Sequence, residues 1–183
     1  IENNALKILK KKKNLRIIDA SKLNLEKYSN IISFCDSFLL QTPDNKKLNK
    51  NNFKIVSKKK PSLETFNNLI FAFNVCRNVK SNGIVLTKNN STIGIGSGQP
   101  SRLDSCRIAI KKMKKFQKIK DQDEIIAASD AFFPFTDGIE ELAEVGVKAI
   151  IQPGGSIRDK ESILAANKAK AKMIFTGIRH FNH

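Results

Sequence analysis

The spacing of apolar residues changes after Pro61, and the sequence divides into two parts at this point. Before it, short apolar stretches separated by loops rich in Asn, Lys and Asp predict strands at 14–20, 37–41 and 53–58. After it, apolar residues recur at the spacing of one helix face at Phe66, Leu69, Ile70, Phe73 and Cys76. This second pattern predicts a helix over 62–79.

From residue 83 onward, predicted strands and helices alternate. The stretches 83–88 and 92–96 predict two strands, and Asn89-Asn90 between them predicts a hairpin turn. Ser101 and Asp104 have the spacing of a capping box, which predicts a helix through about Lys115. The remaining predicted elements are strands at 125–133, 147–155 and 172–178 and helices at 136–146 and 159–171. Such alternation is typical of an α/β layered fold, which binds ligands at the carboxyl ends of its strands.

Length and composition fit a globular protein. With 183 residues, 40% of them hydrophobic, the chain can bury one substantial core. No apolar run approaches the ~20 residues needed to cross a bilayer. The opening IENNALKILKKKK has neither an apolar signal core nor a cleavage site. We therefore expect a soluble protein with no membrane partner, and a piece of a longer chain.

The cysteines and histidines do not form a recognisable metal or disulfide pattern. Cys35, Cys76 and Cys106 are widely spaced, odd in number and set inside apolar segments. With His180 and His183 as the only histidines, a zinc cluster of His and Cys is not expected. A reducing, cytoplasmic setting is therefore the expectation.

The net charge of +16 raises the question of a polyanionic partner. Most of this charge is lysine, beside many asparagines and isoleucines, and such a bias can extend across a whole proteome without a function. Arginine, which reads bases and carboxylates better, is sparse. We favour a solvated surface, and a basic nucleic-acid-binding α/β module stays open as the alternative.

Polar loops at the predicted strand ends hold the first candidate site residues. GIGSGQ at 94–99 resembles a phosphate-binding loop but lacks the Lys-Ser/Thr of a P-loop, so a hairpin strand and turn is the favoured interpretation. Arg102 follows in the first helical turn, where a cation opposes the helix dipole unless it has an anionic partner. QPGGS at 152–156 fits a turn with a helix cap, backbone donors for a ligand, or both. Asn82 either ends a helix or offers its amide to a developing oxyanion.

Two further segments have both a structural and a functional interpretation. The tail FTGIRHFNH groups Arg179, His180 and His183, and an unimportant terminus and a functional one are equally favoured. In SDAFFPFTDG we expect Phe133 or Phe135 in the core. An aromatic face beside the Asp137 carboxylate would also suit a heteroaromatic ligand, by stacking and by hydrogen bonds to ring nitrogens.

Taken together, five motifs resemble one family. KSN-x-I-V, T-I-G-I-G-x-G-Q-x-S-R, SDAFFPF-x-DGI, A-I-I-Q-P-G-G-S-I-R-D and F-T-G-x-R-H-F-x-H are similar to segments of the bifunctional purine biosynthesis proteins, PurH, and occur in family order and spacing. The similarity runs from about Ala5 to His183, is weakest over 21–52, and lies in the C-terminal AICAR transformylase half.

The resemblance implies a fold and a reaction. The family transfers a formyl group from 10-formyltetrahydrofolate to the amine of the imidazole nucleotide AICAR. Its transformylase region is a duplicated three-layer α/β/α unit of the cytidine-deaminase kind, and its dimers form active sites across the subunit interface. Residues 1–60 would be the end of the first subdomain and 61–183 the second. The zinc-deaminase signature is absent, so no metal is expected to be required.

Residue roles follow from the resemblance position by position. Asn82 matches an asparagine that steadies the formyl oxygen as it becomes an oxyanion, which makes it the catalytic candidate. The positions matching AICAR contacts are Arg102, Phe132, Arg179 and His183. The positions matching folate contacts are Leu103 and Asp137.

One departure from the family pattern concerns activity. The family's general acid and base, a histidine beside a lysine in a Lys-His-x-Asn-Pro stretch, lie upstream of the similar region, and this sequence has no such stretch. Loss of proton transfer costs roughly 10² to 10⁴ in rate. We expect the chain alone to be inactive or nearly so, and the cyclohydrolase domain is also missing. A non-catalytic folding or dimerisation fragment is therefore a further alternative.

Overall fold

The computed structural model describes residues 2–19, 21–22, 29–42, 44, 46–116, 118–120 and 122–182. The chain folds as two compact units, Ile1–Asn45 and Lys46–His183. No helix in these described ranges is long and apolar enough to cross a membrane.

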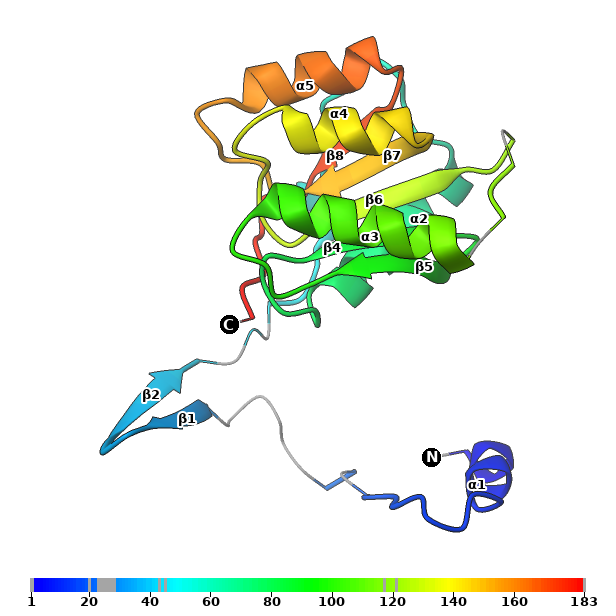
Figure 1. The fold of residues 1–183 in the computed structure, drawn as a ribbon, viewed down its shortest axis with the longest axis vertical. Coiled ribbons are helices and arrows are strands. Elements are labelled where there is room, and N and C mark those ends of the chain that lie inside the picture. Colours follow the sequence, from blue (N-terminus) through cyan, green and yellow to red (C-terminus); the bar gives the residue numbers. More distant parts are fainter. Residues whose placement is uncertain are drawn as a thin grey trace. The chain divides into compact units, whose positions relative to one another are not determined.

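In its described residues, the first unit contains one short helix and one hairpin (Figure 1). Helix α1 spans Asn3–Leu9, and strands β1 (Asn30–Phe34) and β2 (Ser37–Gln41) pair antiparallel. The prediction of a strand at 37–41 is confirmed. The prediction at 14–20 is wrong over its described part, because residues 14–19 pair with no strand and Ile18 is 83% exposed.

The second unit is built on a six-stranded mixed sheet in the order β3-β8-β7-β6-β4-β5. Its strands are β3 (Lys54–Ile55), β4 (Ile84–Lys88), β5 (Ser91–Gly96), β6 (Ile125–Ser129), β7 (Val147–Gln152) and β8 (Lys172–Phe175). β6, β7 and β8 are parallel, whereas the pairs β3–β8, β4–β5 and β4–β6 are antiparallel. Asn89 and Asn90 both have positive φ, as the hairpin turn between β4 and β5 requires.

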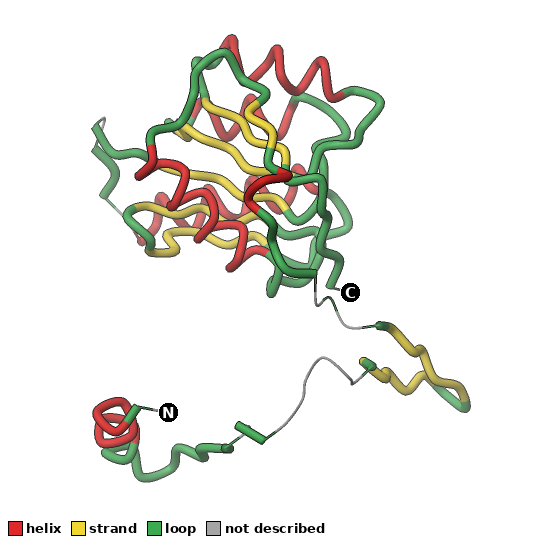
Figure 2. The backbone as a smooth tube through the Cα atoms, turned by 180° about the vertical axis from the view of Figure 1, so that it is seen from behind, coloured by secondary structure: helices red, strands yellow, loops and turns green. Residues whose placement is uncertain are grey.

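Helices cover both faces of this sheet (Figures 1 and 2). α2 (Leu63–Cys76) packs on one face. The other face is covered by α3 (Arg102–Phe116), α4 (Asp137–Glu144) and α5 (Asp159–Lys168). The predicted three-layer α/β/α architecture is therefore confirmed.

Alternation along the strands divides the core into two clusters. In β6, Ile125 and Ala127 face α3 and α4, whereas Ile126 and Ala128 face α2. Because both faces are covered, β6 is buried at every position, as strands between two helix layers are. This explains why residues 125–128 of the strand are all apolar.

Several strands end earlier than predicted. β6 ends at Ser129 rather than at residue 133, and β7 and β8 end three residues early, at Gln152 and Phe175. Beyond these ends the backbone turns into loops whose polar groups bond to neighbouring segments, such as Phe133 N–H to the side chain of Gln152, the last residue of β7, at 3.0 Å. The predicted strand at 53–58 is reduced to the two residues of β3.

Candidate functional site

Five loops meet at one edge of the sheet. The carboxyl ends of parallel strands β6, β7 and β8 lie at this edge, and β5 also ends there because both β5 and β6 are antiparallel to β4. The turn before β4 reaches the same edge. The segments 80–83, 97–101, 130–136, 153–158 and 176–182 are thereby brought together, which is the usual ligand position in open α/β sheets.

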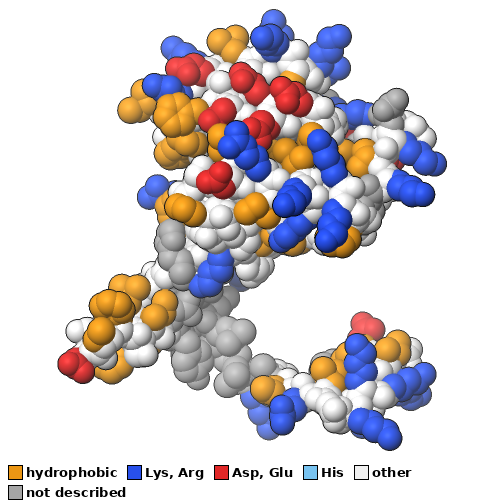
Figure 3. Space-filling model, in the orientation of Figure 1, with side chains coloured by type: hydrophobic (Ala, Val, Ile, Leu, Met, Phe, Trp, Pro, Cys, Tyr) orange, Lys and Arg blue, Asp and Glu red, His pale blue; other side chains and the backbone are white. Residues whose placement is uncertain are grey.

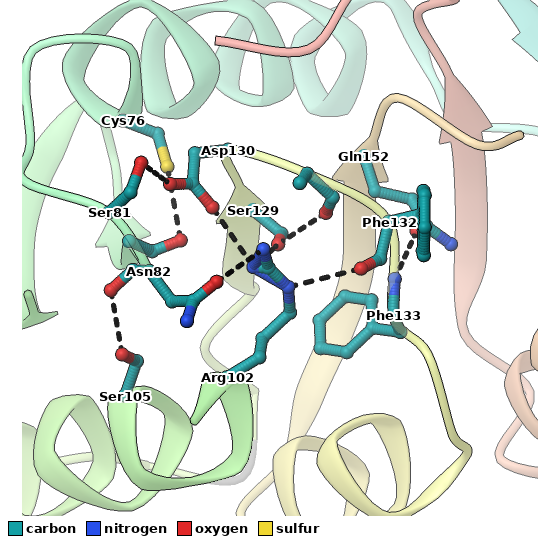
Figure 4. A network of polar contacts seen from close by, with 12 residues as sticks. Cys76, Ser81, Asn82, Arg102, Ser105, Ser129, Asp130, Phe132, Phe133 and Gln152 are labelled. Carbon is teal, nitrogen blue, oxygen red and sulfur yellow. Dashed lines mark hydrogen bonds and ion pairs between the residues drawn. The ribbon is translucent and has the colours of Figure 1, made fainter. Parts of the chain in front are cut away.

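Arg102, the first residue of α3, is the centre of a polar network at this edge (Figure 4). Its side chain is buried and pairs with the Asp130 carboxylate at 3.0 Å. It also donates to Asn82 Oδ1 at 2.8 Å, to the Phe132 carbonyl at 3.1 Å and, at 3.5 Å, to Ser129 Oγ. Burial lowers the pKa of Arg102, while the Asp130 carboxylate acts in the opposite direction. Asp130 is thus the anionic partner that a cation at this helix start requires.

These bonds leave Arg102 with limited donor capacity. A guanidinium has five N–H groups. Nε uses one for the Phe132 carbonyl, NH1 uses two for Asp130 and Ser129, and NH2 uses one for Asn82. Among the described residues, one N–H of NH2 therefore remains for a ligand.

The Asn82 side chain is held on all sides. Its Oδ1 accepts from Arg102, and its Nδ2 donates to the carbonyls of Gln99 at 2.9 Å and Pro100 at 3.1 Å. Its own carbonyl accepts from Ser105 Oγ at 2.7 Å. Because an amide has two N–H groups, both are occupied here. An oxyanion can therefore be bound only if it replaces one of the two carbonyls.

The C-terminal segment is fixed to the site as far as it is described. Ser81 N–H donates to the Asn182 carbonyl at 2.9 Å, and Asn182 N–H donates to Ser81 Oγ at 3.2 Å. His180 N–H donates to the Asp130 carbonyl at 3.0 Å, and the buried His180 ring lies 5.1 Å from that of Phe73. The tail is part of the fold here, and His180 packs in the core.

A hollow of about 270 Å³ opens between these loops. It is lined by Asn82, Pro100, Arg102, Ala131, Phe132, Pro134, Arg179 and Phe181. Phe132 also borders two neighbouring hollows, one of about 320 Å³ with Arg179 and the glycines of the 153–155 turn, the other of about 410 Å³ with Phe135 and Arg158. The half-buried Phe132 ring is therefore a wall shared by three connected recesses.

Four of the predicted site residues share the lining of one hollow: Asn82, Arg102, Phe132 and Arg179. Arg179 is exposed, with its guanidinium 5.0 Å from the Phe181 ring. The two predicted folate positions lie outside that lining. Leu103 is half-buried on α3, and Asp137 is exposed in the first turn of α4, where its Oδ1 accepts from Gly138 N–H. His183 lies outside the described residues.

Sequence reasoning missed the residues that hold the site together. Asp130, Ser81 and Gln152 were not predicted as site residues. The side chain of each nevertheless forms a hydrogen bond to a residue of another segment of the chain. Asp130 had a usable signal, because a charged residue directly after a strand buried on both faces needs a buried partner. Its partner, Arg102, was the cation already noted at a helix start.

The two glycine-rich segments fit the structural interpretation. Gly94 and Gly96 lie in β5, where an added Cβ would be 2.2 Å from the Ala109 carbonyl and 1.8 Å from that of Ser105. They allow α3 to lie directly on the strand. In the 152–156 segment, the Gly155 and Ser156 N–H groups donate to the Asp159 carboxylate at 2.7 and 3.2 Å. These backbone donors are thus occupied by the side chain of Asp159, the first residue of α5, which closes the turn; the N-cap residue Arg158 makes no side-chain capping bond.

The fold and the site together define a three-layer α/β protein whose polar, arginine-containing hollow at the strand ends is of the kind that binds small molecules. The family model described as AICARFT/IMPCHase bienzyme matches residues 1–112. The chain belongs to this family.

Curated relatives agree with this assignment. "Bifunctional purine biosynthesis protein PurH" of Petrotoga mobilis is 45% identical over 182 residues, covering 100% of this chain and 34% of the relative. The protein of the same name from Elusimicrobium minutum is 44% identical over 180 residues, covering 98% and 35%. That of Leptospira biflexa (strain Patoc 1 / Ames) is 46% identical over 183 residues, covering 99% and 35%. The chain spans about a third of the length of the curated relatives it matches.

Among solved structures, the chain is similar to dCMP deaminase from the cyanophage S-TIM5. The complex with dCMP and dUMP has a TM-score of 0.44 at 18% identity, covering 62% of this chain and 98% of the deaminase chain. The apo form has a TM-score of 0.41 at the same identity and coverage.

Proposed function

We propose that this chain is part of an AICAR transformylase, which transfers the formyl group of 10-formyltetrahydrofolate to the amine of AICAR in purine biosynthesis. The observation that supports it is the meeting of Asn82, Arg102, Phe132 and Arg179 around one hollow. These residues come from four separate segments, and each matches a family position for the nucleotide or the transferred group. Family membership alone would not bring them together in space.

In the proposed complex the AICAR imidazole stacks on Phe132. The remaining N–H of Arg102 and the exposed guanidinium of Arg179 donate to the nucleotide. The formyl oxygen replaces the Pro100 carbonyl on Asn82 Nδ2, the longer of its two bonds at 3.1 Å. A donor held by Arg102 at its other end is preorganised for the charge that develops on that oxygen.

The rest of the proposal concerns the folate site, the partners and setting of the full-length protein, and its subdomains. Folate binds through Leu103 and Asp137, and His183 lies at the edge of the nucleotide site. The reaction needs no metal, and the full-length protein acts in the cytoplasm as a homodimer, with no nucleic-acid or membrane partner. Residues 1–60 end its first deaminase-like subdomain and 61–183 form the second, with residues 54–55 of the first adding strand β3 to the second's sheet. The chain alone lacks the Lys-His pair and is inactive.

A chimera tests this proposal directly. The part of the Petrotoga mobilis relative outside the matched region is joined ahead of Ile1, so that the Lys-His pair and this chain's residues are present together. We expect the purified chimera to consume 10-formyltetrahydrofolate only when AICAR is present. This chain alone, assayed in parallel, should show no transfer.

Two variants of the chimera sharpen the result. Asn82→Ala should lower kcat by roughly 10² to 10³, the cost of removing one oxyanion donor. Lys111→Ala, an exposed change in the second half of α3, should leave kcat unchanged. A folded, dimeric chimera with no AICAR-dependent turnover would overturn the proposed function. Transfer by the chain alone would refute only the expected inactivity of the isolated chain.

A further inference from the structure

The Asp130 carboxylate lies behind the hollow rather than in it. The residue follows directly after β6, is 0% exposed, and does not belong to the lining. Its Oδ1 accepts from Arg102 NH1 at 3.0 Å and its Oδ2 accepts from Ser81 Oγ at 2.6 Å (Figure 4). Because the residue is fully buried and lies outside the lining, Asp130 has no direct contact with a ligand in the hollow, and both of its carboxylate oxygens bond within the protein.

Asp130 connects three segments that each contribute to the hollow. Through Arg102 it reaches α3, and Arg102 in turn orients the Asn82 amide. Through Ser81 it reaches the turn that contains Asn82, and Ser81 exchanges two hydrogen bonds with Asn182. Its own carbonyl accepts from His180 N–H, next to Arg179. Each of the three segments is bonded, directly or through one side chain, to this one residue.

The direction of the Arg102 side chain depends on this arrangement. A buried guanidinium without a counter-charge is strongly unfavourable, so removal of Asp130 favours any rotamer that brings Arg102 to solvent. Such a rotation would break the bond to Asn82 Oδ1 and free the amide that we assign to the formyl oxygen. Loss of Asp130 would therefore change the geometry of the site and not only its stability.

A similar cluster at the other end of the same strand offers a comparison. Glu124 directly precedes β6, pairs with Lys172 and accepts from Thr65 Oγ1. It has the same composition as the Asp130 cluster, namely a carboxylate, a cation and a hydroxyl. It lies at the opposite edge of the sheet and borders none of the three recesses.

We propose that Asp130, with Ser81, is a positioning residue that sets the orientation of Arg102 and Asn82 and ties the C-terminal segment to them. The identity of the ligand rests on the proposed function, but the positioning itself does not. Asp130 acts on the reaction only through the residues it holds.

The first test observes Arg102 in the isolated chain without any ligand. All arginines of the sequence lie in the described part of the chain, and Arg102 is the one whose side chain is buried. Its Nε–H should therefore give a slowly exchanging ¹⁵N NMR signal. Asp130→Asn should speed that exchange by about tenfold or more, because the loss of a charge-assisted hydrogen bond releases the side chain. Glu124→Gln should leave the exchange of the Arg102 Nε–H slow, when the two variants are compared at equal free energies of unfolding.

Two substitutions of similar shape at residue 81 separate the role of the Ser81 hydroxyl from effects on folding. Ser81→Thr keeps an O–H for Asp130 and should keep the slow Arg102 signal. Ser81→Val has nearly the shape of threonine without the hydroxyl and should lose it. If Asp130→Asn and Ser81→Val both retain a slow Arg102 Nε–H, the proposal is wrong.

The second test measures AICAR affinity by calorimetry on the same variants. Asp130→Asn should weaken binding by about tenfold or more, whereas Glu124→Gln should stay within about twofold of the unchanged chain. If both variants lose AICAR affinity equally, Asp130 has only a structural role and the positioning proposal is wrong. If the unchanged chain binds no AICAR, the proposed ligand is wrong for this chain, and the exchange comparison still decides whether Asp130 positions Arg102.

Discussion

Phe132 and Phe133 are adjacent, but their rings lie in different surroundings. Phe133 is buried in the core beneath α3 and α4, with Gly138 packed against its ring. Phe132 is half-buried and borders three recesses, and only its backbone carbonyl bonds inward, to Arg102. The chain direction after β6 therefore sends one aromatic side chain to the core and the next to the site.

Alanine substitution should separate the two roles. Phe133→Ala should lower the free energy of unfolding by about 3–5 kcal/mol, because it leaves a core cavity. Phe132→Ala should cost much less stability but weaken AICAR binding about tenfold, through loss of ring stacking. Chemical denaturation and calorimetry on both variants check this. A Phe132→Ala protein that is unfolded, or that binds AICAR normally, would contradict the assignment.

A buried thiol makes stability depend on alkaline pH. Burial raises the pKa of Cys106 from 9.0 to about 12. Between these values the thiol ionises in the unfolded chain but not in the folded protein, so the unfolded state binds fewer protons. The stabilisation is complete below pH 9 and declines as pH rises toward 12, at a limiting slope of about 1.4 kcal/mol per pH unit.

Denaturant titrations from about one unit below to about one and a half units above the unfolded thiol's pKa of 9.0 measure this decline. Cys106→Ala removes one titrating thiol and should reduce the slope, although it lowers stability at every pH. Cys76, whose pKa burial also raises, continues to contribute in that variant. An unchanged slope in Cys106→Ala would show that Cys106 is not protonated in the folded protein over this range.

At the scale of single residues, the sequence pointed to part of the lining of one hollow but not to the residues that hold that lining, and the predicted positions Leu103 and Asp137 lie outside it. Motif similarity pointed to Asn82, Arg102, Phe132 and Arg179, and the structure places all four around one hollow. The hydrogen bond between Ser81 and Asp130 joins residues 49 apart in the sequence. No periodicity in the chain encodes such a contact, because it depends on how the loops meet after folding.

At the scale of elements, the contact between β5 and α3 determines where the site's arginine lies. α3 packs so closely on β5 that its backbone carbonyls occupy the space where side chains of residues 94 and 96 would be. The first residue of this helix is Arg102. The glycines of the strand therefore set the height of Arg102 above the sheet.

Gly96→Ala should disturb this contact. The added Cβ would lie 1.8 Å from the Ser105 carbonyl, so the helix must move away, at a cost of about 1–3 kcal/mol or more. Ser105 also bonds to the Asn82 carbonyl, so the shift should weaken AICAR binding as well. Thr92→Ala, an exposed change on the same strand, is the control and should affect neither quantity. Thermal unfolding at normal Tm for Gly96→Ala would refute the close packing.

Periodicity predicted the helices and the central strands well, but it predicted strand ends and the strand at 14–20 poorly. The helix of 62–79, the Asn89-Asn90 hairpin and the alternating units after residue 125 are all present, because each buries a regular apolar face. The stretch 14–20 has strand-like composition, but its described residues 14–19 pair with no described strand, and strand ends were overextended by several residues. Some apolar residues past a strand end, such as Phe133, lie in a loop and still pack in the core. Periodicity does not distinguish such buried loop residues from residues of the strand itself.

At the scale of the whole molecule, the two units differ in how much apolar surface they bury. Hydrophobic side chains are exposed on the hairpin of the first unit (Figure 3). They are Ile31, Phe38 and Leu40 on one face and Ile32, Phe34 and Leu39 on the other, exposed by 44% to 77%. A two-stranded hairpin is marginal alone, and one that is apolar on both faces needs cover on both. The second unit closes its own core.

The structural division also differs from the subdomain boundary expected at residue 60. β3 pairs with β8, the Val56 N–H donates to the Met173 carbonyl at 3.0 Å, and Ser57 Oγ accepts from Met173 N–H at 2.7 Å. Lys58 N–H donates to the Asn167 side chain at 2.7 Å. Residues 54–58 thus complete one edge of the second unit's sheet.

Two truncations test where the folding unit begins. The segment 46–183 keeps β3 and should unfold cooperatively, with a Tm close to that of the same unit in the whole chain. The segment 61–183 loses β3, the two hydrogen bonds to Met173, worth about 0.5–1.5 kcal/mol each, and the packing of Val56 on the core, which should lower its stability by about 1–3 kcal/mol. Sedimentation should also show that 46–183 self-associates less than the whole chain, because the apolar hairpin is gone. If 61–183 is as stable as 46–183, β3 is dispensable and the unit begins at the expected boundary instead.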